Sequence, residues 1–326
     1  MRRIGLAVVL ALSPFVAPFA AEGQTAKVPR IGYLVVSPLV DPPSAERQAF
    51  LDGLRDLGYV AGRTVNIEYR SAAWNRELLP DLAAELVELK VDVIVANPGT
   101  VEAARDATKT IPIVVPSITD AVEDRLVASL SRPGGNITGP GGTASELSAK
   151  RIELLKEAVP RLSKVAVLWN PSNQGAPLQW NGTQTAARLL GVTLQSHEVR
   201  DPNGFPRALA AMTRSRPDAL LVFLSPLTTA YRPIIVEAAL KQRLPTMFAL
   251  KADVEAGGLI SYSANLPAVF RRAAHYVDRI LKGAIAGDLP IEQPTKFELV
   301  INLKTAKALG LTIPQSVLLR ADQIIE

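Results

Sequence analysis

Short apolar runs that end at turn-forming residues recur along the chain. The clearest is Val165–Trp169, which Asn170 and Pro171 terminate. A similar run at Ile31–Val36 ends at Ser37. Runs of this kind are typical of strands that are buried on both faces of a parallel sheet. The stretches between the runs carry apolar residues every three or four positions, which predicts helices.

The alternation covers both halves of the chain. In the first half we expect strands at Ile31–Val36, Thr64–Tyr69, Val91–Ala96 and Ile111–Val115, and helices at Ser44–Leu57, Leu78–Leu89, Thr100–Thr108 and Val122–Leu130. In the second half we expect strands at Val165–Trp169, Val192–Val199, Ala219–Leu224, Thr246–Ala249 and Phe297–Ile301, and helices at Glu146–Val159, Ala176–Leu190, Pro206–Met212, Thr229–Gln242 and Ala268–Leu281. Strands that alternate with helices form parallel sheets through right-handed crossovers. The pattern therefore predicts an α/β protein of two similar halves, with a cleft between two sheets.

Two segments are candidates for crossings between the halves. Arg132–Gly142 is rich in glycine and proline and falls where the first α/β series ends. It could be a surface loop, but its place in the series favours a crossing. Gly257–Tyr262 is expected to be a return crossing.

The N-terminus has the features of a secretory leader. Arg2 and Arg3 precede an apolar stretch, and Ala21-Glu22-Gly23 provides small residues where a signal peptidase cleaves. The apolar stretch is interrupted by Pro14 and Pro18, which is unfavourable for a membrane-spanning helix. We therefore expect residues 1–23 to be a cleaved signal peptide. Because no cysteine follows it, the protein is not expected to be a lipoprotein, and its expected location is the periplasm.

Composition excludes several functions. A chain of 326 residues is long enough for two lobes, and the 48% hydrophobic and 21% charged residues are ordinary for a folded protein. The absence of cysteine excludes disulfides and thiolate chemistry, and only two histidines, His197 and His275, are present, so no metal centre is expected. The formal net charge of +5 is dispersed without a basic stripe, so nucleic acid is not an expected partner.

Small polar residues follow several of the expected strands. In open parallel sheets, ligands bind beyond the carboxyl ends of the strands, close to helix N-termini. This rule selects Ser37, Asn97, Gly99, Thr100, Thr119, Asp120, Asn170, Asn173, Ser225 and Phe248 as candidate ligand-binding residues. Each polar residue of the set could instead be a helix cap without a ligand. Their convergence on one cleft favours binding of a small polar ligand.

Aromatic residues near these loops could hold a planar part of a ligand. Trp74 has polar neighbours and no core periodicity, so it is a candidate for the cleft, and Tyr262 lies near a predicted loop edge. Trp169 ends a buried strand and is expected to lie in the core.

Signals for catalysis are weak. The sequence contains no G-x-S-x-G, no phosphate-binding GxxxxGK[ST] and no HExxH motif. His197 falls in an expected strand and His275 in an expected helix, where each is expected to be structural. We therefore predict that the protein is not an enzyme and needs no cofactor.

Six stretches carry a resemblance to a known family. They are RIGYL at 30–34, LSRPGGNITG at 130–139, KRIELLKEAVP at 150–160, VAVLWNP at 165–171, AGGLISY at 256–262 and DLPIEQPTKFELVINLKTAKALGLTIP at 288–314. In these stretches the chain resembles the ABC-transporter substrate-binding proteins, in the group described as tryptophan/tyrosine-type or uncharacterised. Proteins of this group have the type I periplasmic binding protein fold. The resemblance covers nearly all of the chain after the leader.

The resemblance implies two Rossmann-like lobes with parallel sheets, joined by a three-crossing hinge. The N-terminal lobe is then expected to contain residues 24–138 and 262–296, and the C-terminal lobe residues 139–261 and 297–326. By position, the resemblance implies a pocket that includes Ser37, Asn97, Gly99, Thr100, Asp120, Asn170, Asn173, Ser225 and Tyr262. Residues 97–102 (NPGTVE) and 120–122 (DAV) depart from the usual family sequence at the expected pocket wall, so the ligand does not follow from the resemblance alone.

These observations predict the solute-binding component of an ABC importer. It would act as a monomer that captures a small polar ligand between its lobes and delivers it to a permease in the inner membrane. An aromatic amino acid or aromatic carboxylate is the first choice of ligand, with a branched aliphatic amino acid, a nucleoside or a small sugar as alternatives. A secreted sensor with the same fold is a second hypothesis for the function, and a secreted α/β hydrolase is a third.

Overall fold

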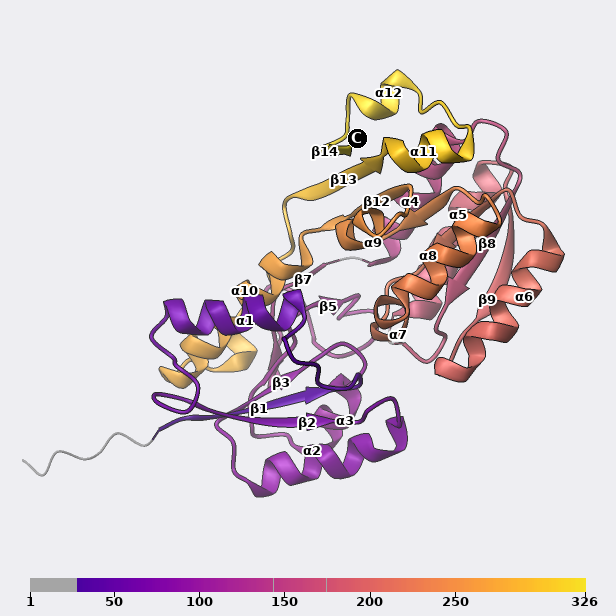
Figure 1. Ribbon diagram of the computed structural model, residues 1–326. Helices are drawn as coiled ribbons and strands as arrows, with labels where there is room; N and C mark the ends of the chain where they lie inside the picture. The colour runs from indigo at the N-terminus through magenta and orange to yellow at the C-terminus, as the bar shows by residue number, and fades with distance from the viewer. Residues whose placement is uncertain (1–27, 143, 174) are drawn as a thin grey trace, which may run out of the picture.

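The chain folds into two α/β lobes that face each other across a gap (Figure 1). The computed structural model describes residues 28–142, 144–173 and 175–326, without the side chains of residues 119, 142 and 144–146. The expected signal peptide therefore lies outside the described residues. None of the described helices combines the length and the apolar character that a membrane span requires.

The first lobe is built on a five-stranded parallel sheet with the order β2-β1-β3-β4-β6. Its strands are β1 (Arg30–Val35), β2 (Asn66–Ser71), β3 (Val93–Ala96), β4 (Ile113–Val114) and β6 (Ile137–Thr138). The helices between these strands are α1 (Ala45–Asp56), α2 (Leu79–Glu88) and α3 (Val101–Ala107). A two-stranded pair, β5 (Ile118–Thr119) and β7 (Gly141–Gly142), lies between the lobes, where the chain first crosses.

The second lobe is built on a seven-stranded sheet with the order β14-β13-β12-β11-β10-β8-β9. Its strands are β8 (Lys164–Trp169), β9 (Thr193–Glu198), β10 (Ala219–Val222), β11 (Thr246–Phe248), β12 (Ile260–Ala264), β13 (Phe297–Asn302) and β14 (Gln323–Ile325). Its helices are α4 (Ala144–Ala158), α5 (Ala176–Leu189), α6 (Phe205–Ser215), α7 (Pro226–Ala230), α8 (Arg232–Lys241), α9 (Lys251–Glu255), α11 (Leu303–Leu309) and α12 (Gln315–Leu318). All strand pairs of this sheet are parallel except β12 with β13, which is antiparallel.

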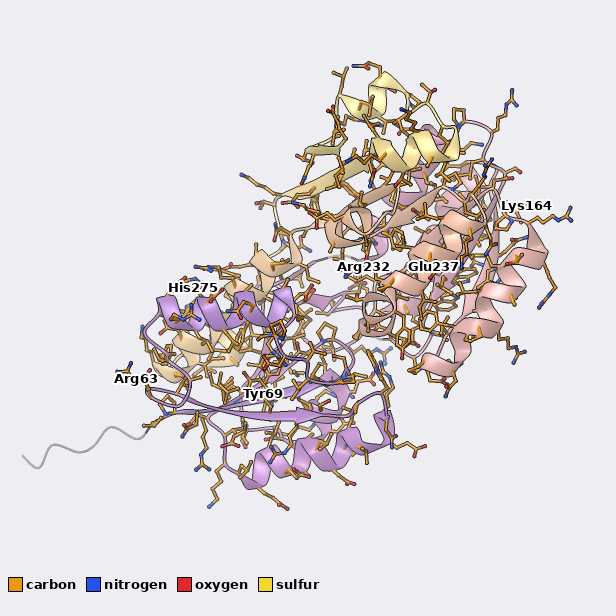
Figure 2. All side chains as sticks on the ribbon, in the orientation of Figure 1. Arg63, Tyr69, Lys164, Arg232, Glu237 and His275 are labelled. Atoms are coloured by element: carbon orange, nitrogen blue, oxygen red, sulfur yellow. The ribbon has the colours of Figure 1, made fainter. Side chains whose placement is uncertain are left out.

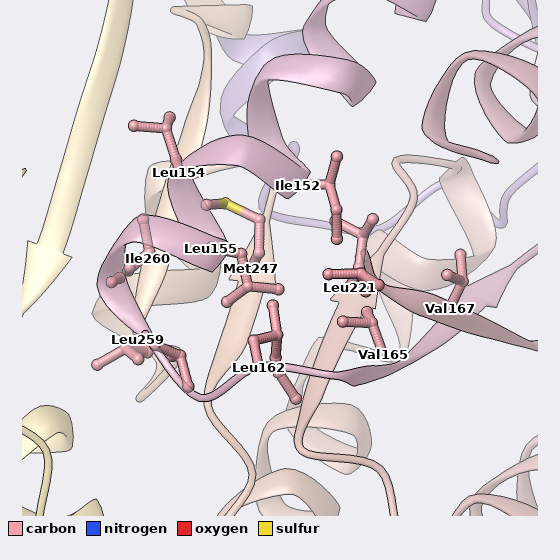
Figure 3. Packing of buried hydrophobic residues seen from close by; sticks show 14 of the residues in the cluster. Ile152, Leu154, Leu155, Leu162, Val165, Val167, Leu221, Met247, Leu259 and Ile260 are labelled. Atoms are coloured by element: carbon pink, nitrogen blue, oxygen red, sulfur yellow. The ribbon is translucent and has the colours of Figure 1, made fainter. Parts of the chain in front are cut away.

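Each sheet is buried on both faces because successive side chains of a strand point in opposite directions. In β8, Val165 and Val167 pack into the cluster beneath α4 and α5, whereas Ala166 and Leu168 pack into the cluster beneath α6 and α8. Figure 3 shows the first of these clusters, in which Ile152 of α4 lies over strand residues of the sheet. This two-sided burial explains why the strands read as uninterrupted apolar runs.

Charged side chains remain on the outside of both lobes. Arg63 in the first lobe and Lys164 and Glu237 in the second are exposed (Figure 2). The two histidines lie within regular elements, His197 in β9 and His275 in α10 (Leu266–Leu281).

Two segments differ from the sequence-based expectation. The helix expected at Val122–Leu130 is absent, and these residues form a series of turns. The backbone is left-handed at Asp120 (φ 47°) and Arg125 (φ 54°), which is incompatible with a continuous helix. The second half of the expected crossing at Gly257–Tyr262 belongs to β12, an inner strand of the second sheet, and the chain leaves the second lobe only after Ala264.

The second and third crossings enclose helix α10. The helix follows β12 and precedes β13, which both belong to the second sheet, yet it packs along α1 in the first lobe (Figure 1). Fold class and strand membership thus agree with two lobes joined by three crossings. The domain boundaries given above remain predictions, which these sheet memberships support.

A glycine permits the close approach of α1 and α10. A Cβ atom at Gly53 would lie 2.8 Å from the carbonyl oxygen of Arg271 and 2.9 Å from the Cβ of Ala274. Both distances are too short for real contacts, and the backbone carbonyl cannot move aside without shifting the helix. Gly53 therefore sets the distance between the two helices.

We predict that Gly53→Ala destabilises the protein by roughly 1–3 kcal/mol, because the added methyl group overpacks the helix interface. Helix propensity alone would make the variant more stable than the wild type, since alanine is preferred to glycine within a helix. The measurement is urea denaturation of both proteins. Gly135→Ala is the matched control, because Gly135 has open space around it and no left-handed φ. A more stable Gly53→Ala variant would show that the two helices are not packed this closely.

Candidate functional site

A cavity of about 720 Å³ lies between the two lobes. The first lobe contributes residues at the carboxyl ends of β1 and β3, among them Ser37 and Asn97. The second lobe contributes Ser225, which follows β10, and Asn173, which precedes α5. The cavity thus lies where parallel sheets commonly bind ligands, and its volume suits a small organic molecule.

The structure brings half of the candidate residues together at this cavity. Those in its wall are Ser37, Trp74, Asn97, Gly99, Asn173 and Ser225. Asn170 lies beside it, at a small hollow that also includes Trp74 and Arg76. Ligand contact by these residues remains a prediction, but their positions are compatible with it.

The other candidates are outside the cavity wall. Thr100 is 1% exposed, and its hydroxyl donates to the carbonyl of Asn97 at 2.8 Å. Phe248 packs in the core beneath α6 and α8, and Asp120 is buried at a left-handed position. Tyr262 packs against Phe297, with ring centroids 5.9 Å apart. The side chain of Thr119 is not among those that the structure describes.

Hydrogen bonds hold the Asn97 corner of the cavity rigidly. The hydroxyl of Tyr33 donates to Asn97 Oδ1 at 3.1 Å, and Asn97 Nδ2 donates to the carbonyl of Leu34 at 3.0 Å. Burial raises the pKa of the Tyr33 hydroxyl well above its usual value, so it remains a neutral donor. The side chain of Asn97 is therefore oriented before any ligand arrives.

Position 99 requires glycine because of its backbone conformation and the side chain next to it. Its φ of +88° is left-handed, and a Cβ there would lie 2.9 Å from the guanidinium of Arg76. Arg76 Nη1 donates to the Gly99 carbonyl at 3.2 Å. Glycine lets the backbone form the cavity wall with the arginine directly behind it.

Trp74 reaches across the gap between the lobes. It follows β2 of the first lobe, where Ala73 and Trp74 are both left-handed, with φ of 46° and 73°. Its ring meets that of Tyr231 in the second lobe, with centroids 6.5 Å apart, and Tyr231 stacks on Phe205 at 4.8 Å. Two successive left-handed residues store backbone strain, which frequently marks a functional site. Trp74 and Tyr231 both line the cavity and form an aromatic wall.

The other two tryptophans lie in the second lobe. Trp169 is 7% exposed and stacks on Trp180 at a centroid distance of 5.2 Å. Its indole nitrogen donates to Ser196 Oγ at 2.8 Å. Trp169 is thus a core residue.

The structure adds four charged residues that the strand-end rule does not select. They are Glu46 and Arg47 of α1, Arg151 of α4 and Arg232 of α8. Arg151 lies four residues after Leu147 and four residues before Leu155, so helical spacing puts it on the same buried face as these leucines. This pattern in the sequence could have indicated Arg151.

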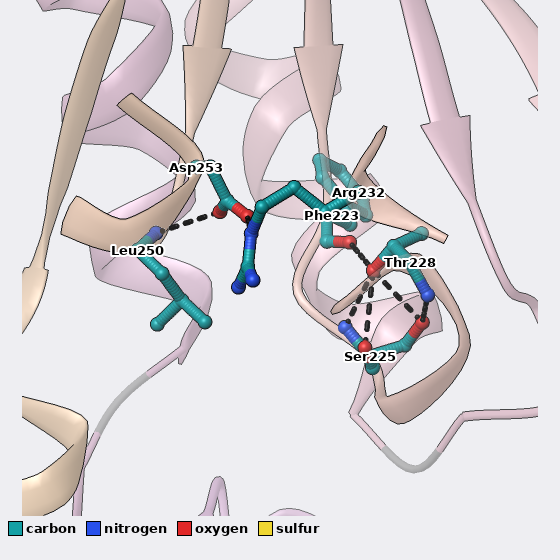
Figure 4. A network of polar contacts seen from close by, with 6 residues as sticks. All are labelled: Phe223, Ser225, Thr228, Arg232, Leu250 and Asp253. Carbon is teal, nitrogen blue, oxygen red and sulfur yellow. Dashed lines mark hydrogen bonds and ion pairs between the residues drawn. The ribbon is translucent and has the colours of Figure 1, made fainter. Parts of the chain in front are cut away.

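Arg232 is held by a polar network on the second lobe (Figure 4). Its Nε donates to Asp253 Oδ1, and the amide of Leu250 donates to the other carboxylate oxygen at 3.2 Å. Burial raises the pKa of Asp253 in spite of the arginine beside it. In the same view Ser225 and Thr228 cap α7 reciprocally, with Thr228 N donating to Ser225 Oγ at 3.1 Å and Ser225 N to Thr228 Oγ1 at 3.0 Å.

These features are suited to binding a small ligand. The described residues contain no group of three or more His, Asp and Glu side chains that could hold a metal ion. The cavity wall combines aromatic rings, amides, hydroxyls and guanidinium groups from two lobes. Its composition is suited to holding a small ligand with a planar part and an anionic part. Fold and site together are those of a two-lobed ligand-binding protein.

Comparison with known proteins identifies the family. Residues 35–325 match the family described as ABC transporter substrate binding protein, so the chain belongs to this family. A tyrosine-binding protein from Clostridioides difficile (strain R20291) is 28% identical over 280 residues, which are 85% of this chain and 80% of the relative.

Two solved structures share the fold and more than a quarter of the sequence. A conserved domain protein from Vibrio cholerae O1 biovar El Tor has a TM-score of 0.84 and 28% identity, covering 91% of this chain and 100% of that chain. An ABC domain from Streptococcus pneumonia, solved in complex with L-Trp, has a TM-score of 0.81 and 27% identity, covering 91% of this chain and 99% of that chain. The expected family and the type I periplasmic binding protein fold are therefore confirmed.

We predict that Trp74→Ala opens the ligand-free protein, because it removes the ring contact between Trp74 and Tyr231. Lobe opening increases the radius of gyration, which small-angle X-ray scattering measures. Leu78→Ala is the control, since Leu78 is 43% exposed and lies outside the cavity wall. Superimposable scattering curves for the wild type and Trp74→Ala would show that this contact does not hold the lobes together.

Proposed function

We propose that this protein is the solute-binding component of an ABC importer and captures an aromatic amino acid or aromatic carboxylate between its lobes. The observation that carries the proposal is the aromatic wall formed by Trp74 and Tyr231, which come from different lobes and line one cavity. A planar ligand packed there would contact both lobes at once and stabilise the closed arrangement.

The relatives support this choice of ligand class. One is a tyrosine-binding protein, and another was solved with L-Trp. Neither identity is high enough to transfer a particular ligand to this chain. This chain shares its fold with the protein solved with L-Trp, and the aromatic wall of this chain is independent support for an aromatic ligand.

Export and delivery complete the proposal. The N-terminal leader, residues 1–23, directs the protein to the periplasm, where it is released as a monomer. Closure of the lobes around the ligand creates a composite surface that a permease in the inner membrane recognises. Binding and recognition are thereby coupled through one domain motion.

Thermal melting against a panel of small molecules tests the proposed ligand class. The panel contains L-tyrosine, L-tryptophan, benzoate, 4-hydroxybenzoate, L-leucine, nucleosides and hexoses. A ligand present at 100 times its Kd stabilises the protein by about 2.7 kcal/mol, which raises Tm by roughly 4 °C in a protein of this size. We expect the shift with aromatic members only. A shift confined to hexoses or nucleosides would refute the proposal.

We further predict that the tryptophan emission of the protein responds to the ligand through Trp74. In Trp74→Phe the response should disappear while binding, measured by calorimetry, weakens by less than about tenfold, because phenylalanine retains a ring. Trp169 and Trp180 remain in this variant as internal references. An undiminished emission change in Trp74→Phe would place the ligand away from the aromatic wall.

A further inference from the structure

Arg151 is a buried cation in the cavity wall. It is 3% exposed and lies on the face of α4 that meets the cavity. Its Nε donates to the carbonyl of Tyr262 at 2.8 Å, and among the described residues it forms no ion pair. Burial lowers the pKa of its guanidinium to about 10, so the group is still charged at neutral pH. The charge of Asp253 acts on Arg151 without forming an ion pair with it, and a buried charge without a direct partner is costly, which calls for an explanation.

Gln179 is a second buried polar group in the same wall. It lies on α5, which packs along α4, and it is 5% exposed. Its Oε1 has no hydrogen-bond partner among the described residues. Buried amides are nearly always hydrogen-bonded in folded proteins, so an unsatisfied one facing a cavity indicates a missing partner.

The nearby carboxylates do not form an ion pair with Arg151. Asp253 is engaged by Arg232 and by the amide of Leu250. Glu46 lies on α1, in the other lobe. Arg151 and Gln179 thus lie in the wall of the same cavity, on adjacent helices of one lobe, and each has unused hydrogen-bonding capacity.

We propose that Arg151 binds the carboxylate group of the ligand and that Gln179, in the same subsite, accepts a hydrogen bond from a donor group of that ligand. The bond from Nε to Tyr262 fixes the orientation of the guanidinium and leaves its two terminal nitrogens for a carboxylate. Hydrogen bonds from a guanidinium to a carboxylate are among the strongest available to a protein. The unpartnered Oε1 of Gln179 is an acceptor, so it accepts a hydrogen bond from a donor of the ligand, such as the ammonium group of an amino acid. The bound anion compensates the buried charge, which Asp253, already paired with Arg232, offsets only in part.

This inference rests on the proposed function and narrows it. The aromatic wall accepts the ring of the ligand, and the Arg151–Gln179 subsite requires an acid. Neutral sugars and nucleosides lack the group that the subsite binds. An aromatic compound without a carboxylate should also be a poor ligand.

Acid and amide pairs test the inference, because an amide keeps the shape of the acid and removes its charge. The pairs are L-tyrosine with L-tyrosinamide, 3-phenylpropionate with 3-phenylpropionamide, and L-leucine with L-leucinamide, measured by calorimetry. We expect the wild type to bind the acid of at least one pair about 30-fold or more tighter than its amide. In Arg151→Gln this preference should fall to within roughly threefold, because the charged donor is gone.

Three further variants separate binding from folding. Arg151→Lys keeps the charge and should retain part of the preference, and Gln179→Leu should weaken binding of the acid while thermal stability is maintained. Lys150→Gln is the matched control, since Lys150 is the neighbouring cation on α4 but pairs with Glu153 outside the cavity wall. Its acid preference should equal that of the wild type.

The outcomes distinguish this inference from the proposed function. If only L-leucine binds, and Arg151→Gln abolishes its acid preference, the subsite stands and the aromatic ligand is wrong. If aromatic amides bind as tightly as the acids, or if Arg151→Gln keeps the preference, the subsite is wrong and the aromatic ligand stands. Binding of a neutral sugar or nucleoside without any acid would overturn both.

Discussion

The packing of α10 on α1 is the constraint on which the arrangement of the whole molecule depends. Helix α10 is enclosed in the chain by β12 and β13, two adjacent strands of the second sheet, but it buries its apolar face in the first lobe. The chain must therefore leave the second lobe and return to it, which produces two of the three crossings. Gly53 allows the two helices to come close enough for this packing. The lobes are consequently joined by three crossings, the arrangement of a hinge between two domains.

The site follows from this arrangement. Because the carboxyl ends of β1 and β3 in one lobe and of β10 in the other border the same cavity, the polar residues that follow them line a single space. The strained backbone at Ala73 and Trp74 aims an indole ring across that space at Tyr231. The second lobe contributes the buried charge of Arg151. A ligand that contacts both the rings and the guanidinium couples binding to the relative position of the lobes.

Most of the fold could be predicted from the sequence because two-sided burial leaves a strong apolar signal. Strands β3, β8 and β10 and the helices beside them lie within a few residues of the predicted ranges. The turns at 121–130 could not be predicted, since the left-handed residues Asp120 and Arg125 depend on tertiary packing of Leu126 and Val127 into the core. Strand β12 is hard to predict because it is short and follows two glycines, Gly257 and Gly258, which are typical of turns.

The candidate site was predictable only in part. Residues such as Ser37, Asn97 and Ser225 follow buried strands directly, so the topology alone directs them to the cavity. Thr100 and Phe248 satisfy the same rule, but their side chains turn into the protein, and a sequence does not specify that rotation. Arg151 and Gln179 lie on helices whose cavity-facing side is known only once α4 and α5 are packed. Their importance depends on missing hydrogen-bond partners, which only a three-dimensional structure reveals.

Closure of the two lobes around an aromatic ligand is the central claim, and a distance measured between the lobes tests it most directly. The chain has no cysteine, so Glu88→Cys on α2 and Arg207→Cys on α6 introduce the only two sites for spin labels. Without ligand, the distance distribution should be broad and include open arrangements. With a saturating aromatic ligand it should narrow to the short separation of the closed lobes. A distribution that stays the same while calorimetry shows the ligand bound would contradict the account.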